Sequence, residues 1–99
     1  MLGEAKDTLE VPGRYIFPGG IDVHVHMDDL GAEEMEDWRH GSLAAAAGGI
    51  TTVADMPIDN VPATVNGDTL RMKLERIKGN SYTDYMAWGA LPQIIWLPS

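Results

Sequence analysis

The chain has 99 residues, a net charge of −8 and no cysteine. This negative charge argues against nucleic acids and anionic membrane surfaces as partners. The lack of cysteine excludes a disulfide framework and a thiolate zinc site. The N-terminus has no basic start followed by a long apolar core, and the apolar run at 94–97 is too short to cross a bilayer. We therefore expect a cytoplasmic protein.

Residues 1–17 are mixed and charged, and within them residues 13–17 predict one short strand before a Pro-Gly-Gly turn. The stretch that follows, residues 18–26, predicts a strand with two chemically distinct faces. One face would carry Asp22, His24 and His26, and the other Ile21, Val23 and Val25. The apolar face predicts packing under helices.

The two histidines of this strand are candidate metal ligands. Imidazole is the commonest protein metal ligand, and His24 and His26 would point the same way, so they can chelate one ion. Two solvated histidines on a half-exposed strand are the alternative. The next residues, 27–31, predict a loop at the C-terminal end of the strand, in which Asp28 and Asp29 fit a solvated acidic loop or a site equally well.

A first helix is predicted from about Glu33, because acidic side chains are favoured at a helix N-terminus, to Gly48 and Gly49, which end it. Met35, Trp38 and Ser42 fall on one stripe of this helix. His40 is expected at its surface. Residues 50–56, rich in branched side chains and closed by a proline, predict a second strand.

A second helix is predicted from an N-cap at Asp68 to Gly79. Its apolar stripe would be Leu70, Leu74 and Ile77, with the lysines and arginines, Lys73 among them, on the other faces. Residues 82–89 predict a third strand, with Tyr85 and Trp88 packed in a core. Alternating strands and helices predict an α/β fold with a parallel sheet and right-handed crossovers.

Three blocks in this order resemble the cyclic amidohydrolases, the group of allantoinase, dihydroorotase and hydantoinase. They are residues 18–26 (Pro-Gly-Gly-Ile-Asp-Val-His-Val-His), residues 41–53, and residues 55–57 (Asp-Met-Pro). The resemblance extends from about Gly13 to Leu91. It implies that residues 18–99 are the first two or three βα units of a TIM (β/α)8 barrel, and that residues 1–17 are a remnant of a small β-sandwich domain.

A complete barrel takes about 250 residues, so the resemblance implies an incomplete barrel, from a truncated reading frame, a split gene or an incomplete sequence.

In the family, the counterparts of His24 and His26 bind one ion of a binuclear centre, usually zinc. A carboxylated lysine, two further histidines and a late aspartate complete the site that opens the ring. No histidine follows His40, and the last lysine, Lys78, falls in a predicted helix. We therefore expect an isolated chain that is inactive and binds one ion weakly. A small cyclic amide and, in the complete protein, a second copy are the implied partners.

Two loop positions bear on the substrate. Dihydroorotases carry arginine at the position of Asp28, and a carboxylate cannot grip an anionic substrate as a guanidinium does. They also carry Asn-Thr after Met-Pro, where this chain has Ile58 and Asp59. Asp28 and Asp59 are thus candidate substrate-binding residues of an allantoinase-like enzyme that converts allantoin to allantoate, and residues 82–89 resemble the third strand of such enzymes. Dihydroorotase and hydantoinase (dihydropyrimidinase) remain alternatives. The competing class is a non-catalytic βα protein that oligomerises or binds metal.

Overall fold

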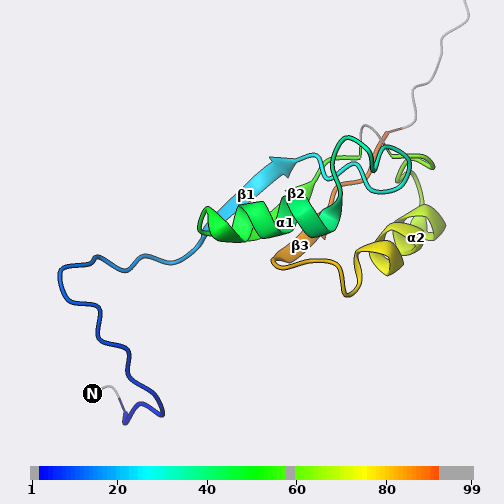
Figure 1. The fold of residues 1–99 in the computed structure, drawn as a ribbon. Helices are drawn as coiled ribbons and strands as arrows, with labels where there is room; N and C mark the ends of the chain where they lie inside the picture. Colours follow the sequence, from blue (N-terminus) through cyan, green and yellow to red (C-terminus); the bar gives the residue numbers. More distant parts are fainter. Residues whose placement is uncertain (1–2, 58–59, 92–99) are drawn as a thin grey trace, which may run out of the picture.

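The computed structural model describes residues 3–57 and 60–91, which form a three-stranded sheet and two helices (Figure 1). Along the chain these are β1 (Gly20–Val25), α1 (Trp38–Ala47), β2 (Ile50–Asp55), α2 (Gly67–Ile77) and β3 (Asp84–Ala87). The strands lie in the order β1-β2-β3, and both pairs are parallel. The predicted α/β organisation with a parallel sheet is therefore confirmed.

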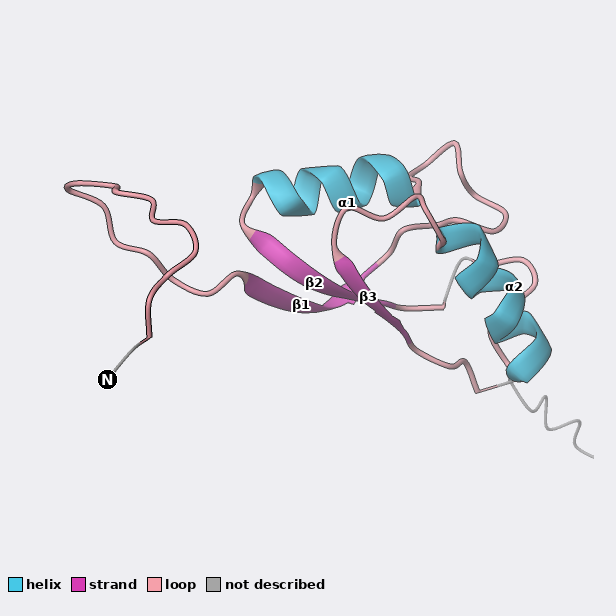
Figure 2. Ribbon diagram, turned by 90° about the horizontal axis from the view of Figure 1, so that it is seen from below, coloured by secondary structure: helices cyan, strands magenta, loops and turns pink. Residues whose placement is uncertain are grey.

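One face of the sheet is covered by α1, which lies along the strands (Figure 2). Trp38, at the start of α1, is fully buried in a cluster with Val53 of β2 and Ile77 of α2. Its ring meets that of Tyr85 edge to face, with 5.4 Å between centroids. Gly41 allows α1 to come close to the chain after β1, because a Cβ there would lie 2.2 Å from the Sδ atom of Met27. The core therefore sits between α1 and the sheet.

The pairing of β1 with β2 is irregular, and this decides which side chains of β1 face the core. Gly20 pairs with Ile50 and Ile21 with Thr52, whereas Asp22 pairs with Val53 and Val25 with Asp55. Between Gly20 and Ile21 one step on β1 matches two on β2, and between Asp22 and Val25 three steps match two. The second shift places one extra residue on β1, as a β-bulge does, and interrupts the simple alternation of faces.

The bulge corrects two expectations about β1. Of its apolar side chains only Val25 packs against the core, while Ile21 and Val23 are 65% and 56% exposed. Asp22 lies level with the buried Val53, so it shares the helix-covered face and not the face of the histidines. The prediction that three apolar residues pack under helices, opposite three polar ones, is therefore wrong.

The helix α1 begins at Trp38, five residues later than Glu33, where it was expected. Asp37 is the N-cap: it has an extended backbone with φ −132°, and its side chain accepts a hydrogen bond from the His40 N–H. A capping carboxylate satisfies free N–H groups of the first turn, which fixes the helix start at that residue. Met35 lies before the helix and is 75% exposed, so the expected stripe holds only for Trp38 and Ser42.

The helix α2 is capped by Asn66, and not by Asp68 as expected. The Asn66 side chain accepts hydrogen bonds from the Asp68 and Thr69 N–H groups, and the Thr69 hydroxyl accepts one from the Asn66 N–H. This reciprocal arrangement is a capping box. The helix lies off the end of the sheet at which β1 and β2 finish (Figure 1). Its buried residues are Lys73 and Ile77, whereas Leu74 is 38% exposed.

Residues 3–19 form neither helix nor strand and run away from the sheet (Figure 1). The strand expected at 13–17 is absent, and Tyr15, Ile16 and Phe17 are largely exposed. A strand needs a neighbour that completes its backbone hydrogen bonds, and nothing among residues 20–57 and 60–91 pairs with this segment. Across the part of the chain that the structure describes, no helix combines the length and apolar character needed to cross a membrane.

Candidate functional site

The two histidines of the first strand lie together. His26 directly follows Val25, the last residue of β1, whose side chain packs against the core, so continued alternation places His26 on the face that α1 leaves open. The His24 ring lies edge-on to the His26 ring, with 5.4 Å between centroids and 68° between planes. Both side chains are exposed. Ordinary alternation thus keeps the two histidines on one face and Val25 on the other, and the bulge separates Asp22 from them.

The centroid spacing of the two rings is close to that of two imidazoles on one metal ion. A tetrahedral zinc ion that bound both rings at a Zn–N distance of about 2.0–2.1 Å would hold their centroids about 5.2 Å apart. The observed 5.4 Å is close to this value. Within residues 3–57 and 60–91 no group of three or more His, Cys, Asp or Glu side chains is gathered for a metal. In this part of the chain the two histidines therefore stand outside any such group.

An apolar surface is formed by residues of all three strands and by Trp88, which follows β3. Val23, Ala54, Met86 and Trp88 contribute to a hollow of about 190 Å³. The Trp88 indole N–H donates to the Val23 carbonyl at 3.0 Å, which fixes the ring across the strand ends. Trp88 is 50% exposed, so its predicted place in the core is wrong, whereas Tyr85 does pack there. Apolar walls beside a few polar groups are typical of small-molecule sites.

The acidic loop after β1 is not solvated. Asp28 and Asp29 are 9% and 3% exposed, which removes the solvated-loop alternative for both. The Asp29 carboxylate accepts hydrogen bonds from the Trp38 N–H at 2.8 Å and the Arg76 Nε–H at 3.1 Å. Asp28 has φ +24°, a backbone conformation that non-glycine residues seldom adopt. Asp59, the other candidate substrate ligand, lies outside the described residues.

A buried polar cluster at the ends of β1 and β2 escaped the sequence reasoning. Lys73 and Asp55 are each 1% exposed, and the Lys73 ammonium contacts both the Asp55 carboxylate and the Asn60 side-chain oxygen. The other Asp55 oxygen accepts from the Met27 N–H at 2.8 Å. The Asn60 amide donates to the Asp29 carbonyl at 2.9 Å. These bonds tie α2 to the residues that follow the histidines.

The sequence did hold a signal for this cluster. Leu70, Lys73 and Ile77 stand at i, i+3 and i+7, which is itself a helical stripe. Read that way, Lys73 stands among core positions, and a buried ammonium needs a buried carboxylate. Asp55, the last residue of the preceding strand, is a carboxylate that can meet this need.

Two carboxylates near the start of α1 have shifted titrations. The hydrogen bond from the His40 backbone N–H, followed by that from its ring, holds the pKa of Asp37 below its usual 3.8. The pKa of Glu33 is lowered below 4.5, first by its own backbone N–H. His40 is a surface residue, as predicted, and its ring Nδ1 lies 2.7 Å from Asp37 Oδ2. Asp37 caps α1 and Glu33 accepts a hydrogen bond from the Gly31 N–H, and both lie apart from the histidine pair in the sequence.

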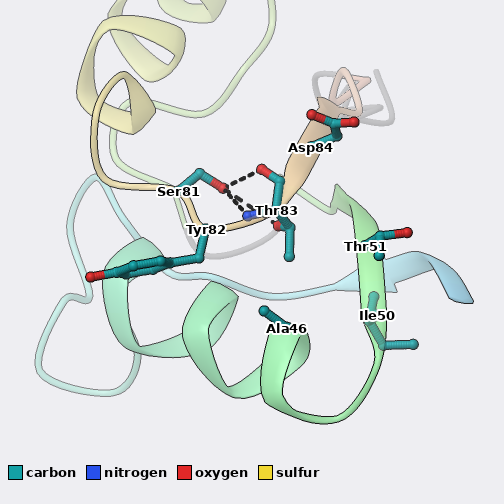
Figure 3. A pocket seen from close by; sticks show the side chains of 7 residues that line it. All are labelled: Ala46, Ile50, Thr51, Ser81, Tyr82, Thr83 and Asp84. Carbon is teal, nitrogen blue, oxygen red and sulfur yellow. Dashed lines mark hydrogen bonds between the residues drawn. The ribbon is translucent and has the colours of Figure 1, made fainter. Parts of the chain in front are cut away.

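A separate hollow of about 370 Å³ lies between the end of α1, the start of β2 and the chain entering β3 (Figure 3). It is lined by Ala46, Ile50, Thr51, Ser81, Tyr82, Thr83 and Asp84. It opens at the N-terminal end of β2, whereas parallel α/β folds keep their active sites at the C-terminal ends of strands. Its lining includes no histidine, lysine or arginine. We assign it no function.

Comparison with known proteins identifies the family. The sequence model described as dihydro-orotase-like matches residues 13–91. The chain is 50% identical over 76 residues to the allantoinase of Arabidopsis thaliana, which covers 77% of this chain and 15% of that protein. It is 49% identical over 86 residues to a probable allantoinase of Oryza sativa subsp. japonica, covering 87% and 17%. It is 40% identical over 90 residues to the allantoinase of Salmonella paratyphi B, covering 91% and 20%.

The chain therefore spans a fifth or less of the length of these curated relatives. The matched residues are those over which the three sequence blocks resembled cyclic amidohydrolases, so that resemblance is confirmed. It covers β1 with its histidine pair, both helices, β2 and β3. By this match and by its similarity to allantoinases, the chain belongs to the dihydro-orotase-like family.

Proposed function

We propose that this chain forms the first βα units of a TIM-barrel hydrolase that opens a cyclic amide, with allantoin as substrate and allantoate as product. One observation carries the proposal. His24 and His26 lie together at the C-terminal end of a parallel strand, in a chain 50% identical to a plant allantoinase over 76 residues. The C-terminal ends of the strands are where barrel enzymes keep their active sites.

His24 and His26 hold one divalent ion, with zinc proposed. A bound ion of this kind polarises a carbonyl and lowers the pKa of a water molecule towards neutrality. Two imidazoles are fewer than the three or four protein ligands of usual zinc sites, so the isolated chain binds zinc in the micromolar range and opens no ring. Further ligands come from barrel strands beyond these 99 residues, and the apolar surface around Trp88 helps to form the wall of the site.

Asp28 and Asp59 are proposed to contact the substrate. Asp28 lies in the loop directly after the histidines and is buried. An ionised carboxylate accepts hydrogen bonds only, which suits a ring that carries N–H groups and no carboxylate. A dihydroorotate carboxylate would instead be repelled. This is the reason for placing allantoin ahead of dihydroorotate, although the matching family model is described as dihydro-orotase-like.

The first experiment measures zinc binding to the purified chain by titration calorimetry. We expect one site that disappears when His24→Ala and His26→Ala are combined. His40→Ala is the matched control, because His40 is exposed and bonded to Asp37 at the start of α1, outside the pair. Zinc affinity that stays unchanged in the double variant would rule out the ligand assignment.

The second experiment tests the reaction. Residues 13–91 replace the corresponding segment of the Arabidopsis allantoinase, and allantoin, dihydroorotate and hydantoin are offered to the purified hybrid. Ring opening of allantoin, lost with the double histidine substitution, is the expected result. Preferential turnover of dihydroorotate would overturn the substrate assignment. A folded, zinc-loaded hybrid without any turnover would favour a non-catalytic βα protein.

A further inference from the structure

A contribution to stability does not by itself explain the buried ion pair between Asp55 and Lys73. Both side chains are 99% buried, since each is 1% exposed. Withdrawing two charges from water offsets most of their attraction, and an apolar pair of the same size often stabilises a fold as well or better. A role beyond general stability would explain why a carboxylate stands at this position.

The two oxygens of Asp55 have different partners. Oδ2 contacts the Lys73 ammonium, and Oδ1 accepts a hydrogen bond from the Met27 N–H at 2.8 Å. Met27 follows His26 directly. Lys73 therefore holds one oxygen of the Asp55 carboxylate, while the other oxygen is hydrogen-bonded to the backbone beside His26, a proposed metal ligand.

His26 is held on its other side as well. The Val25 carbonyl accepts a hydrogen bond from the Met56 N–H at 2.8 Å. Met56 and Asp55, at the end of β2, are thus hydrogen-bonded to the residues immediately before and immediately after His26. Fixing both peptide groups of a residue fixes the direction of its Cα–Cβ bond, and with it the position from which the imidazole reaches out.

The second contact is made by the Asp55 side chain and not by its carbonyl. The Asp55 carbonyl accepts from the Trp88 N–H at 2.9 Å and so serves β3. The carboxylate extends the hydrogen bonding between β1 and β2 one residue past the end of β1. Lys73 neutralises it there, because a lone charge in this interior would not be tolerated.

We propose that Asp55, held in place by Lys73, is a positioning residue for the metal-binding histidine pair. The inference rests on the proposed function only in taking His24 and His26 as metal ligands. Groups that orient a ligand without touching the metal typically account for about 10–100-fold in metal affinity. Asp55 acts through the Met27 peptide and touches neither metal nor substrate.

The test compares two charge-free double variants of the full chain. Asp55→Asn with Lys73→Met keeps an oxygen for the Met27 N–H, and Asp55→Leu with Lys73→Met removes it. We expect the leucine variant to bind zinc about tenfold more weakly than the asparagine variant. Its Met27 amide should also exchange with solvent faster, and its His26 ring resonances should shift. Circular dichroism confirms that both are folded.

A matched control separates positioning from stability. Arg76→Met breaks the neighbouring ion pair with Asp29, one turn along α2, and leaves the Met27 N–H bonded. It should lower stability yet leave zinc affinity and the His26 resonances as in the parent chain. Should the leucine variant not fold, Asp55→Ala with Lys73→Met withdraws the same oxygen without added bulk, and the same comparison applies.

Two failures can be told apart. If the parent chain binds zinc through the histidines and the leucine and asparagine variants bind it equally tightly, the positioning role is overturned and the proposed function stands. If the parent chain binds no zinc, the metal assignment fails. The positioning role is then judged on the His26 resonances and the Met27 exchange rate, and no difference between the two variants overturns it.

Discussion

Replacing Lys73 by methionine tests how the chain holds together. The methionine fills a similar volume, but the Asp55 carboxylate stays buried at 1% exposure with the Met27 N–H as its remaining donor. Removing one partner of a buried ion pair typically destabilises by about 3–5 kcal/mol. Proteins of ordinary stability have about 5–15 kcal/mol in total, so this loss is a large share.

The assay is urea unfolding followed by far-ultraviolet circular dichroism. With an m-value of about 2 kcal/mol/M, the midpoint should fall by about 2 M. Lys78→Met is the control, because Lys78 is exposed at the end of α2 and a surface change of this kind stays within about 0.5 kcal/mol. Adding Asp55→Asn to Lys73→Met should restore much of the loss. A Lys73→Met midpoint equal to that of the control would refute the buried ion pair.

Three further predictions concern the core and the two helix starts. Trp38→Ala should lower stability by about 3–5 kcal/mol in the same assay, whereas Trp88→Ala, at a half-exposed position, should lower it by clearly less; equal losses would contradict the described core. Asn66→Ala should remove about 1 kcal/mol by opening the capping box of α2, seen as a lower urea midpoint. Because hydrogen bonds from His40 lower the pKa of Asp37, its carboxylate stabilises the fold fully above pH 3.8 and loses this effect as the pH falls through the lowered value. Acid unfolding of Asp37→Asn should lack this step, and identical acid curves for variant and parent chain would show that the cap does not titrate.

The order of the elements could be predicted from local pattern, and for a physical reason. The branched residues of β2 and the glycines after α1 act within a few neighbours, so a short window of sequence shows them. The start of α1 could not be predicted as well. Several acidic residues precede it, each of them a suitable first-turn residue, and the choice of Asp37 follows from its bond to His40.

The two faces of β1 and the role of Lys73 could not be predicted from local pattern alone. The bulge depends on pairing with β2, some thirty residues away. Lys73 looked solvated because its partners, Asp55 and Asn60, lie 18 and 13 residues before it. The histidine pair was predictable as a spacing, and its proximity is now observed, whereas the described residues gather no group of three possible metal ligands.

The bulge in β1 makes residue count, and not only residue identity, a requirement of this strand. Between Asp22 and Val25 the chain holds one residue more than the neighbouring strand matches. Any related sequence that keeps both Asp22 and Val25 on the helix-covered face must keep that extra residue. An insertion or deletion here would move the side chains on one side of it to the opposite face of the sheet, whereas most single substitutions would leave every side chain on its present face. Length variation in homologues should therefore be tolerated in the loops on either side of this strand and excluded from within it.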